Sequence, residues 1–104
     1  MIRVCAVDDV PAGEGRAIEV DGRNLAVFHA ASGWYVTDGV CPHRGGPLAD
    51  GIVADASVIC PLHERRFSLR DGREAGGSLC VATFPVSVHG DSVYAQIDRL
   101  ALAA

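Results

Sequence analysis

Two short segments of this chain each contain one cysteine and one histidine. The first reads C-P-H from Cys41 to His43, and the second reads C-P-L-H from Cys60 to His63, with sixteen residues between His43 and Cys60. Thiolates and imidazoles are both ligands of transition metals. Two of each can hold a single tetrahedral ion such as zinc. They can also hold two irons bridged by two sulfides, and the protein would then carry one electron at a time.

The spacing of the four candidate ligands favours the iron–sulfur centre. Zinc fingers usually pair cysteine with cysteine and histidine with histidine, whereas each pair here is mixed. A mixed pair lets one loop reach both irons, the cysteine binding the inner iron and the histidine the outer one. Gly45 and Gly46 follow the first pair, and glycine lets backbone N–H groups approach the sulfides closely. A structural zinc module, acting only as a subunit or scaffold, is the alternative.

The segments CPHRGGPLADGIV and CPLHERRFSLRDG resemble the cluster-binding segments of Rieske-type [2Fe–2S] ferredoxins. The resemblance extends over nearly the whole chain. It implies an all-β fold, a Rieske-type β-sandwich with a small cluster-binding subdomain of two loops at one end. It also implies one [2Fe–2S] cluster, with Cys41 and Cys60 on the buried iron and His43 and His63 on the outer iron near the surface.

The chain differs from the high-potential Rieske proteins of respiratory complexes at four loop positions. Those proteins have a disulfide between two further cysteines, where this chain has Gly46 and Leu62. They also have a serine and a tyrosine that donate hydrogen bonds to the centre, where this chain has Arg65 and Phe67. Phe67 has no hydroxyl, and we expect its ring to pack beside the cluster and exclude water. A reduction potential near the low end of the Rieske range, roughly −150 mV, is therefore predicted, although neighbouring arginines favour the reduced centre.

The segment Glu74–Cys80 bears on the choice of partner. Ferredoxins of ring-hydroxylating dioxygenases often cover the cluster with a proline-bearing loop, but this segment has two glycines and no proline. A shorter or more mobile cover is predicted. The resemblance therefore favours the small subunit of NAD(P)H-dependent nitrite reductase over a free dioxygenase ferredoxin. Either role implies a flavin-bearing reductase as donor and a redox enzyme as acceptor, either the nitrite reductase large subunit or an oxygenase.

Electrons would leave at the exposed edges of the two ligand histidines. The expected docking patch around them consists of Pro42, Arg44, Gly45, Leu62 and Glu64. An oxygenase in its own right would need another iron held by two histidines and a carboxylate. The remaining histidines are His29 and His89, both expected at the surface. We therefore expect an electron-transfer component without a catalytic site of its own.

Length and composition predict a single domain over residues 1–104, with the cluster-binding subdomain at about 40–80. The net charge of −4 and the lack of a basic stripe argue against nucleic-acid binding. No apolar run approaches the ~20 residues that span a bilayer, and the first residues lack a signal-peptide core. We expect no membrane association, a cytoplasmic location and reduced cysteines. The two spare cysteines, Cys5 and Cys80, are expected to be buried thiols.

Apolar residues alternate in short segments separated by turn residues, which predicts strands. Asp21-Gly22 predicts a tight hairpin turn, and residues 47–51 predict a single helical turn. Further strands are expected at 4–7, 16–20, 25–28, 34–36, 58–59 and 67–69. The last hairpin should turn at 89–92 and pair Phe84, Val86 and Val88 with Val93, Ala95 and Ile97.

Overall fold

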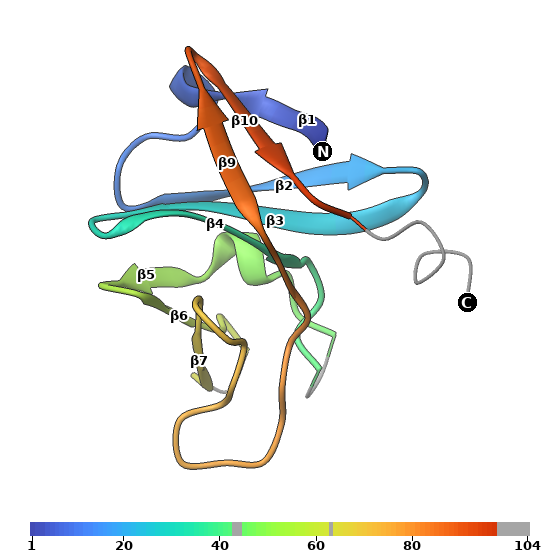
Figure 1. The fold of residues 1–104 in the computed structure, drawn as a ribbon. Coiled ribbons are helices and arrows are strands. Elements are labelled where there is room, and N and C mark those ends of the chain that lie inside the picture. Colours follow the sequence, from blue (N-terminus) through green and yellow to red (C-terminus); the bar gives the residue numbers. More distant parts are fainter. Residues whose placement is uncertain (43–44, 63, 98–104) are drawn as a thin grey trace.

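The computed structural model describes residues 1–42, 45–62 and 64–97. Within these ranges the chain forms short antiparallel strands and two single turns of 3-10 helix (Figure 1). The first sheet contains, in spatial order, β1 (Ile2–Ala6), β10 (Ser92–Ala95) and β9 (Val86–His89). The second contains β2 (Glu14–Val20), β3 (Arg23–Ala30), β4 (Gly33–Asp38) and β8 (Thr83–Phe84). The third contains β5 (Ile52–Ala54), β6 (Ser57–Ile59) and β7 (Arg66–Ser68).

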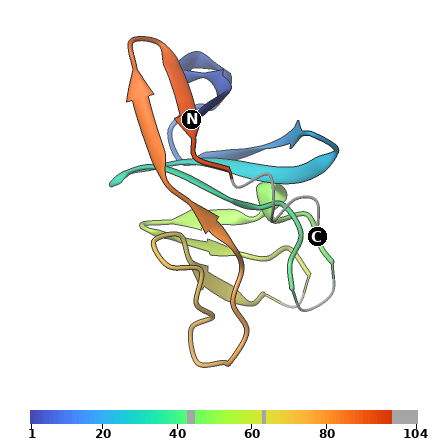
Figure 2. The same ribbon diagram turned by 45° about the vertical axis from the view of Figure 1, so that its right-hand side comes forward.

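The second sheet lies between the other two, and β3 separates two hydrophobic cores (Figures 1 and 2). Leu25 and Val27 belong to the core shared with the first sheet (the upper core), while Ala26 and Phe28 belong to the core shared with the third (the lower core). A strand buried on both faces needs a continuous apolar run rather than alternation. This is why Leu25–Phe28 contains four apolar residues in succession.

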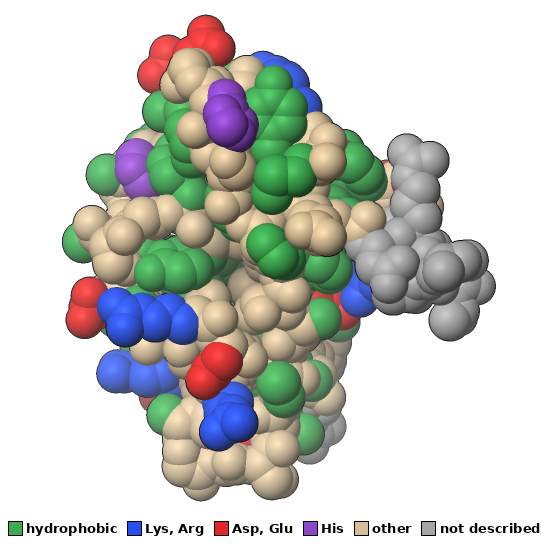
Figure 3. All heavy atoms as spheres, viewed as in Figure 1, with side chains coloured by type: hydrophobic (Ala, Val, Ile, Leu, Met, Phe, Trp, Pro, Cys, Tyr) green, Lys and Arg blue, Asp and Glu red, His purple; other side chains and the backbone are tan. Residues whose placement is uncertain are grey.

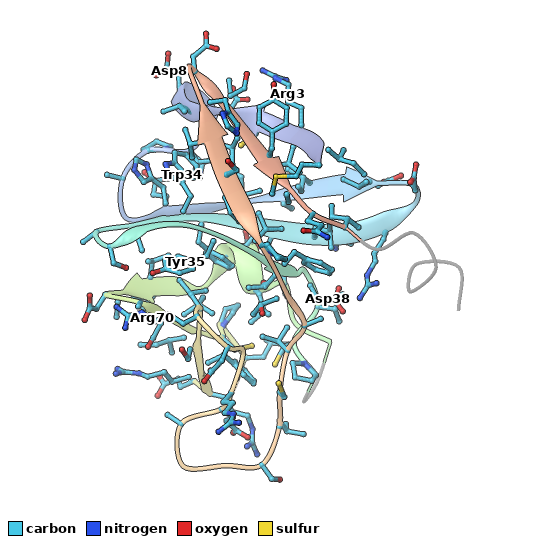
Figure 4. All side chains as sticks on the ribbon, viewed as in Figure 1. Arg3, Asp8, Trp34, Tyr35, Asp38 and Arg70 are labelled. Carbon is cyan, nitrogen blue, oxygen red and sulfur yellow. The ribbon has the colours of Figure 1, made fainter. Side chains whose placement is uncertain are left out.

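β4 divides its side chains between the same two cores. Figure 4 shows Trp34 on the side of the first sheet and Tyr35 on the side of the third, as expected for adjacent residues of a strand. The β2–β3 hairpin turns at Asp21 and Gly22, whose φ angles of 51° and 80° are both left-handed. This is the predicted tight turn. These elements confirm the all-β prediction.

The third sheet supports the segment in which the candidate ligands lie. The predicted helical turn is confirmed as η2 (Leu48–Asp50), which buries Leu48 and Ala49 in the lower core. The amide N–H of Leu48 donates to the carbonyl of Gly39 at 3.0 Å, which attaches this turn to the end of β4. β5 was not expected from the sequence, because it is three residues long and its first residue, Ile52, is 67% exposed.

Two strand predictions need correction. The strand expected at 4–7 is β1 and ends at Ala6, because residues 7–9 form the 3-10 turn η1 (Val7–Asp9). The last hairpin pairs Val88 with Val93 and Val86 with Ala95 as predicted, but Phe84 does not continue it. Phe84 pairs with Val36 in the second sheet. Pro85 lies between β8 and β9, and proline has no N–H to extend a ladder.

None of the helices in the described part of the chain has the length and apolar character needed to cross a membrane.

Candidate metal centre

Cys60 directly follows β6, and Cys41 follows the isolated bridge between Val40 and Pro47; each cysteine begins a closed loop. The N–H of Cys41 donates to the carbonyl of Gly46, and the N–H of Gly45 donates to the carbonyl of Cys41, both at 2.8 Å. The N–H of Cys60 donates to the carbonyl of Arg65 at 2.7 Å. Each loop is thus closed at its base by the amide of its cysteine, and this fixes the direction in which the cysteine side chain leaves the backbone.

The structure brings the two cysteine sulfurs together. Cys41 is 1% exposed and Cys60 is fully buried, and both are free thiols. Burial is the main reason that the pKa of Cys60 is raised, and the neighbouring Cys41 thiol, within hydrogen-bond reach, raises it further. The backbone N–H of Leu62 donates to the Cys60 sulfur and partly offsets this. Two buried, adjacent and unbridged thiols are the donor set that a shared metal centre requires.

The surroundings of Cys60 also fit an iron–sulfur cluster. A Cβ added to Gly46 would lie 3.3 Å from the Cys60 sulfur and 3.0 Å from Cγ of Leu62. The backbone of the first loop therefore lies so close to the second loop that a side chain at position 46 would crowd Cys60 and Leu62. Gly46 and Leu62, the positions of the disulfide in high-potential relatives, face each other. N–H groups near ligand sulfurs are typical of iron–sulfur sites.

His43 and His63 lie outside the described residues, as does Arg44 of the expected docking patch. The other members of that patch, Pro42, Gly45, Leu62 and Glu64, are exposed. The described half of the predicted ligand set is therefore assembled, and most of the predicted docking surface is accessible.

The packing of Phe67 beside the cluster stays a prediction, but its burial is consistent with it. Phe67 is fully buried in the core that also contains Cys41 and Cys60. Its neighbours across the ladder are Val58 in β6 and Glu74 in the following segment. The core that contains the two cysteines is therefore apolar around Phe67.

Sequence reasoning missed the role of Glu74. Its side chain is only 5% exposed, and its carboxylate accepts hydrogen bonds from Nη1 of Arg65 and, at 3.2 Å, from the N–H of Leu79. The N–H of Glu74 also donates to the carbonyl of Leu79 at 3.0 Å. Residues 74–79 wrap around this carboxylate, and a side chain at Gly77 would clash with it. The loop is thus folded around a buried carboxylate, and the shorter or more mobile cover stays a prediction.

The spare cysteines differ from each other. Cys5 is buried in the upper core as predicted, and burial, with a smaller effect of Asp9, raises its pKa. The prediction for Cys80 is wrong, because Cys80 is exposed and the next residue, Val81, enters the lower core instead. In an extended segment adjacent side chains point to opposite sides.

The two remaining histidines also differ from each other. His89 is exposed, as expected. His29 is partly buried, because its ring stacks on Trp34 with centroids 4.1 Å apart and its Nδ1 lies 3.0 Å from the carbonyl oxygen of Val10. Both contacts tie the end of β3 to neighbouring segments, and His29 is a surface residue whose ring is partly covered.

Comparison with known proteins agrees with this geometry. Residues 1–85 match the Rieske [2Fe-2S] domain family. The chain is 31% identical over 98 residues to the ferredoxin component of the naphthalene 1,2-dioxygenase system of Pseudomonas aeruginosa, covering 88% of this chain and 90% of that protein.

Solved structures of two kinds have the same fold. One is a chain from the complex of reduced oxygenase and oxidised ferredoxin in carbazole 1,9a-dioxygenase, with a TM-score of 0.82 and 28% identity, covering 91% of this chain and all of that one (100%). Another is a putative NADH-dependent nitrite reductase small subunit from Mycobacterium tuberculosis, with a TM-score of 0.82 and 26% identity, covering 92% and 94%. The predicted Rieske-type β-sandwich is confirmed. The chain belongs to the Rieske [2Fe–2S] domain family and is an electron carrier with a [2Fe–2S] cluster.

Proposed function

We propose that Cys41, His43, Cys60 and His63 hold the cluster, and that residues 1–104 form one Rieske domain with its cluster-binding subdomain at about 40–80. The observation that supports this most directly is the contact between the buried thiols of Cys41 and Cys60. When bound, the cluster takes up and releases one electron. The chain buries the two cysteine sulfurs, supplies the N–H of Leu62 and excludes water with Phe67.

The ligand assignment is tested by single substitutions. Cys41→Ser and Cys60→Ser should each lower the iron content from two atoms per chain to near zero, because a serine hydroxyl replaces a thiolate. Cys5→Ser is the matched control, since Cys5 is also buried but belongs to the other core. Iron analysis of anaerobically purified protein gives the answer. Full iron content in Cys60→Ser, or the same loss in Cys5→Ser, would contradict the assignment.

The redox state of the centre is tested by electron paramagnetic resonance before and after dithionite. We expect a rhombic signal of low average g in the reduced sample, which marks histidine ligation of one iron. A colourless protein with zinc in place of iron would instead support the structural zinc module.

We propose further that the chain is the ferredoxin component of an oxygenase system in the cytoplasm. It would receive electrons from a flavin-bearing reductase and pass them to a terminal ring-hydroxylating oxygenase. Support comes from its 31% identity to a dioxygenase ferredoxin and its similarity to a chain solved in complex with its oxygenase. The lack of a proline in Glu74–Cys80 favours a nitrite reductase small subunit. However, contacts of Glu74 with Arg65 and Leu79 close this loop without a proline, so the lack of a proline discriminates less between the two roles.

The nitrite reductase small subunit remains the second candidate, supported by 26% identity and a TM-score of 0.82 to such a protein. The two roles differ in how the partner is bound. A free ferredoxin should make a weak contact of under ~1,200 Å² in total. The exposed apolar residues next to the site, Val40 at 41%, Leu62 at 43% and Ile52 at 67%, would contribute to it.

Stopped-flow mixing distinguishes the two candidates. The reduced protein should be reoxidised by a ring-hydroxylating oxygenase in the presence of its aromatic substrate and oxygen, with formation of hydroxylated product. Stable co-purification with a sirohaem- and flavin-bearing chain, without electron transfer to the oxygenase, would instead establish the nitrite reductase role.

A further inference from the structure

Arg65 has a buried hydrogen-bond donor that the described residues do not use. Its Nη1 donates to the Glu74 carboxylate, but its Nε is buried and has no hydrogen-bond partner among the residues that the structure describes. A buried N–H without an acceptor is unfavourable, and native proteins contain few of them. This donor therefore needs an acceptor that the described residues do not supply.

The position of Arg65 in the β6–β7 hairpin directs its side chain to the cysteine side. Val58 pairs with Phe67 and Ile59 with Arg66, and the N–H of Cys60 donates to the carbonyl of Arg65 at 2.7 Å. Cys60 and Arg65 are thus opposite each other. Opposite residues of an antiparallel ladder have their side chains on the same face.

The two faces of this hairpin differ sharply. The face of Arg65 includes Val58, Cys60 and Phe67, all fully buried. The other face includes Ile59, which is half-buried, and Arg66, which is exposed. In Figure 3 arginine side chains occupy the lower part of the molecule next to acidic ones. The two adjacent arginines have different surroundings: Arg66 is exposed, whereas Nε of Arg65 is buried although 36% of its side chain is exposed.

We propose that Nε of Arg65 donates a hydrogen bond to a sulfur of the [2Fe–2S] centre, either a sulfide or the Cys60 thiolate, and that Glu74 is the positioning residue that aims it. The inference rests on the proposed ligand set. Cluster sulfurs are negatively charged acceptors, so loading would satisfy the orphan donor. Because the Glu74 carboxylate neutralises the guanidinium charge, Arg65 acts mainly through this directed N–H rather than through net charge.

The effect on electron transfer follows from charge. One-electron reduction adds one negative charge to the centre, and no covalent bond forms or breaks. An N–H···S bond strengthens with that charge, so Arg65 favours the reduced state. In high-potential Rieske proteins the donors are hydroxyl groups. Here the donor is a guanidinium N–H of Arg65, whose side chain is held in place by the buried Glu74 carboxylate.

Pulsed electron paramagnetic resonance of the dithionite-reduced protein, labelled with ¹⁵N only in arginine, tests the contact directly. We expect a weak ¹⁵N coupling to the cluster in the wild type. It should vanish in Arg65→Lys and persist in Arg44→Lys and Arg66→Lys. Iron content and the rhombic signal establish first that the cluster is present, so failure of the ligand assignment is recognised separately. Absence of the coupling in the wild type, or its persistence in Arg65→Lys, would overturn the inference. The ¹⁵N coupling in the wild type tests the contact even if one of the variants does not bind the cluster.

Potentiometric titration of the same proteins distinguishes a directed bond from a charge. Arg65→Lys keeps the positive charge but removes Nε–H, and should lower the equilibrium constant for reduction by roughly tenfold, as expected for loss of one charge-assisted hydrogen bond. Arg66→Lys should leave it unchanged. Glu74→Gln should retain the ¹⁵N coupling, because the amide oxygen still accepts from Nη1, and should raise the potential. Equal potentials for Arg65→Lys and the wild type would refute the proposal.

Discussion

At the scale of single residues, the four cysteines of this chain occupy three different environments. Cys41 and Cys60 are buried against each other, Cys5 is buried alone in the upper core, and Cys80 is exposed. The identity of the residue is the same in each case. What differs is solvent access and the nearest charge, and these two quantities set the reactivity of a thiol.

Thiol labelling should separate these environments. In the cluster-loaded protein at pH 8, an alkylating reagent should react quickly with Cys80 only. Cys5 should react far more slowly because burial shields it and raises its pKa, so that its reactive thiolate is scarcer at any given pH. Its rate should increase as the pH rises toward that elevated pKa. Peptide mapping by mass spectrometry identifies the labelled residue. Cys5 labelling as fast as Cys80 would contradict the burial of Cys5.

At the scale of elements, the loop of residues 74–79 is folded around the buried carboxylate of Glu74. Glu74 accepts hydrogen bonds from Arg65 in the second cluster loop and from Leu79 at the far end of its own loop. One carboxylate thus connects two segments that are separate in the chain. The space that it occupies is left open by Gly77.

Substitution of Gly77 tests this packing. Gly77→Ala places a methyl group where the Glu74 carboxylate lies, and should destabilise the fold by about 1–3 kcal/mol. Hydrogen exchange in residues 74–80 should increase. Ser78→Ala is the matched control, because Ser78 is exposed in the same loop. Equal chemical denaturation midpoints for Gly77→Ala and Ser78→Ala would show that the loop accommodates the methyl group freely.

At the scale of the whole molecule, the second sheet separates the core that contains Cys5 from the core that contains Cys41 and Cys60, the proposed ligands. The upper core is closed by the first sheet, and Leu25 and Val27 project into it. The lower core includes both cysteines and Phe67. A metal centre that joins two loops contributes its binding energy to the fold that it holds, and here that energy acts on the lower half.

Removal of iron should therefore loosen the two halves unequally. In the apo protein, hydrogen exchange should accelerate first in residues 40–80, while β1, β9 and β10 keep their protection. Hydrogen exchange with mass spectrometry compares the loaded and chelator-treated forms. Uniform loss of protection over all three sheets would show instead that the cores unfold as one unit.

The reduction potential is a second property of the whole molecule. We expect roughly −150 mV, the low end of the Rieske range, because the loops lack the disulfide and hydroxyl donors of high-potential relatives. The Arg65 donor, which favours the reduced state, and the buried ring of Phe67 also affect this reduction potential. Protein-film voltammetry measures it, and a clearly positive value would contradict the prediction.

Much of the molecule was determined by local sequence alone. Alternating apolar residues and the Asp21-Gly22 turn predicted the β2–β3 hairpin, and the two Cys-Pro motifs predicted a metal centre, because both signals act over a few residues. The tertiary structure alone decided the rest. It exposed Cys80, moved Phe84 into the second sheet and buried Glu74 beside Arg65. Those outcomes depend on which distant segment covers a side chain, and burial and ion pairing between segments leave no periodic trace in the sequence.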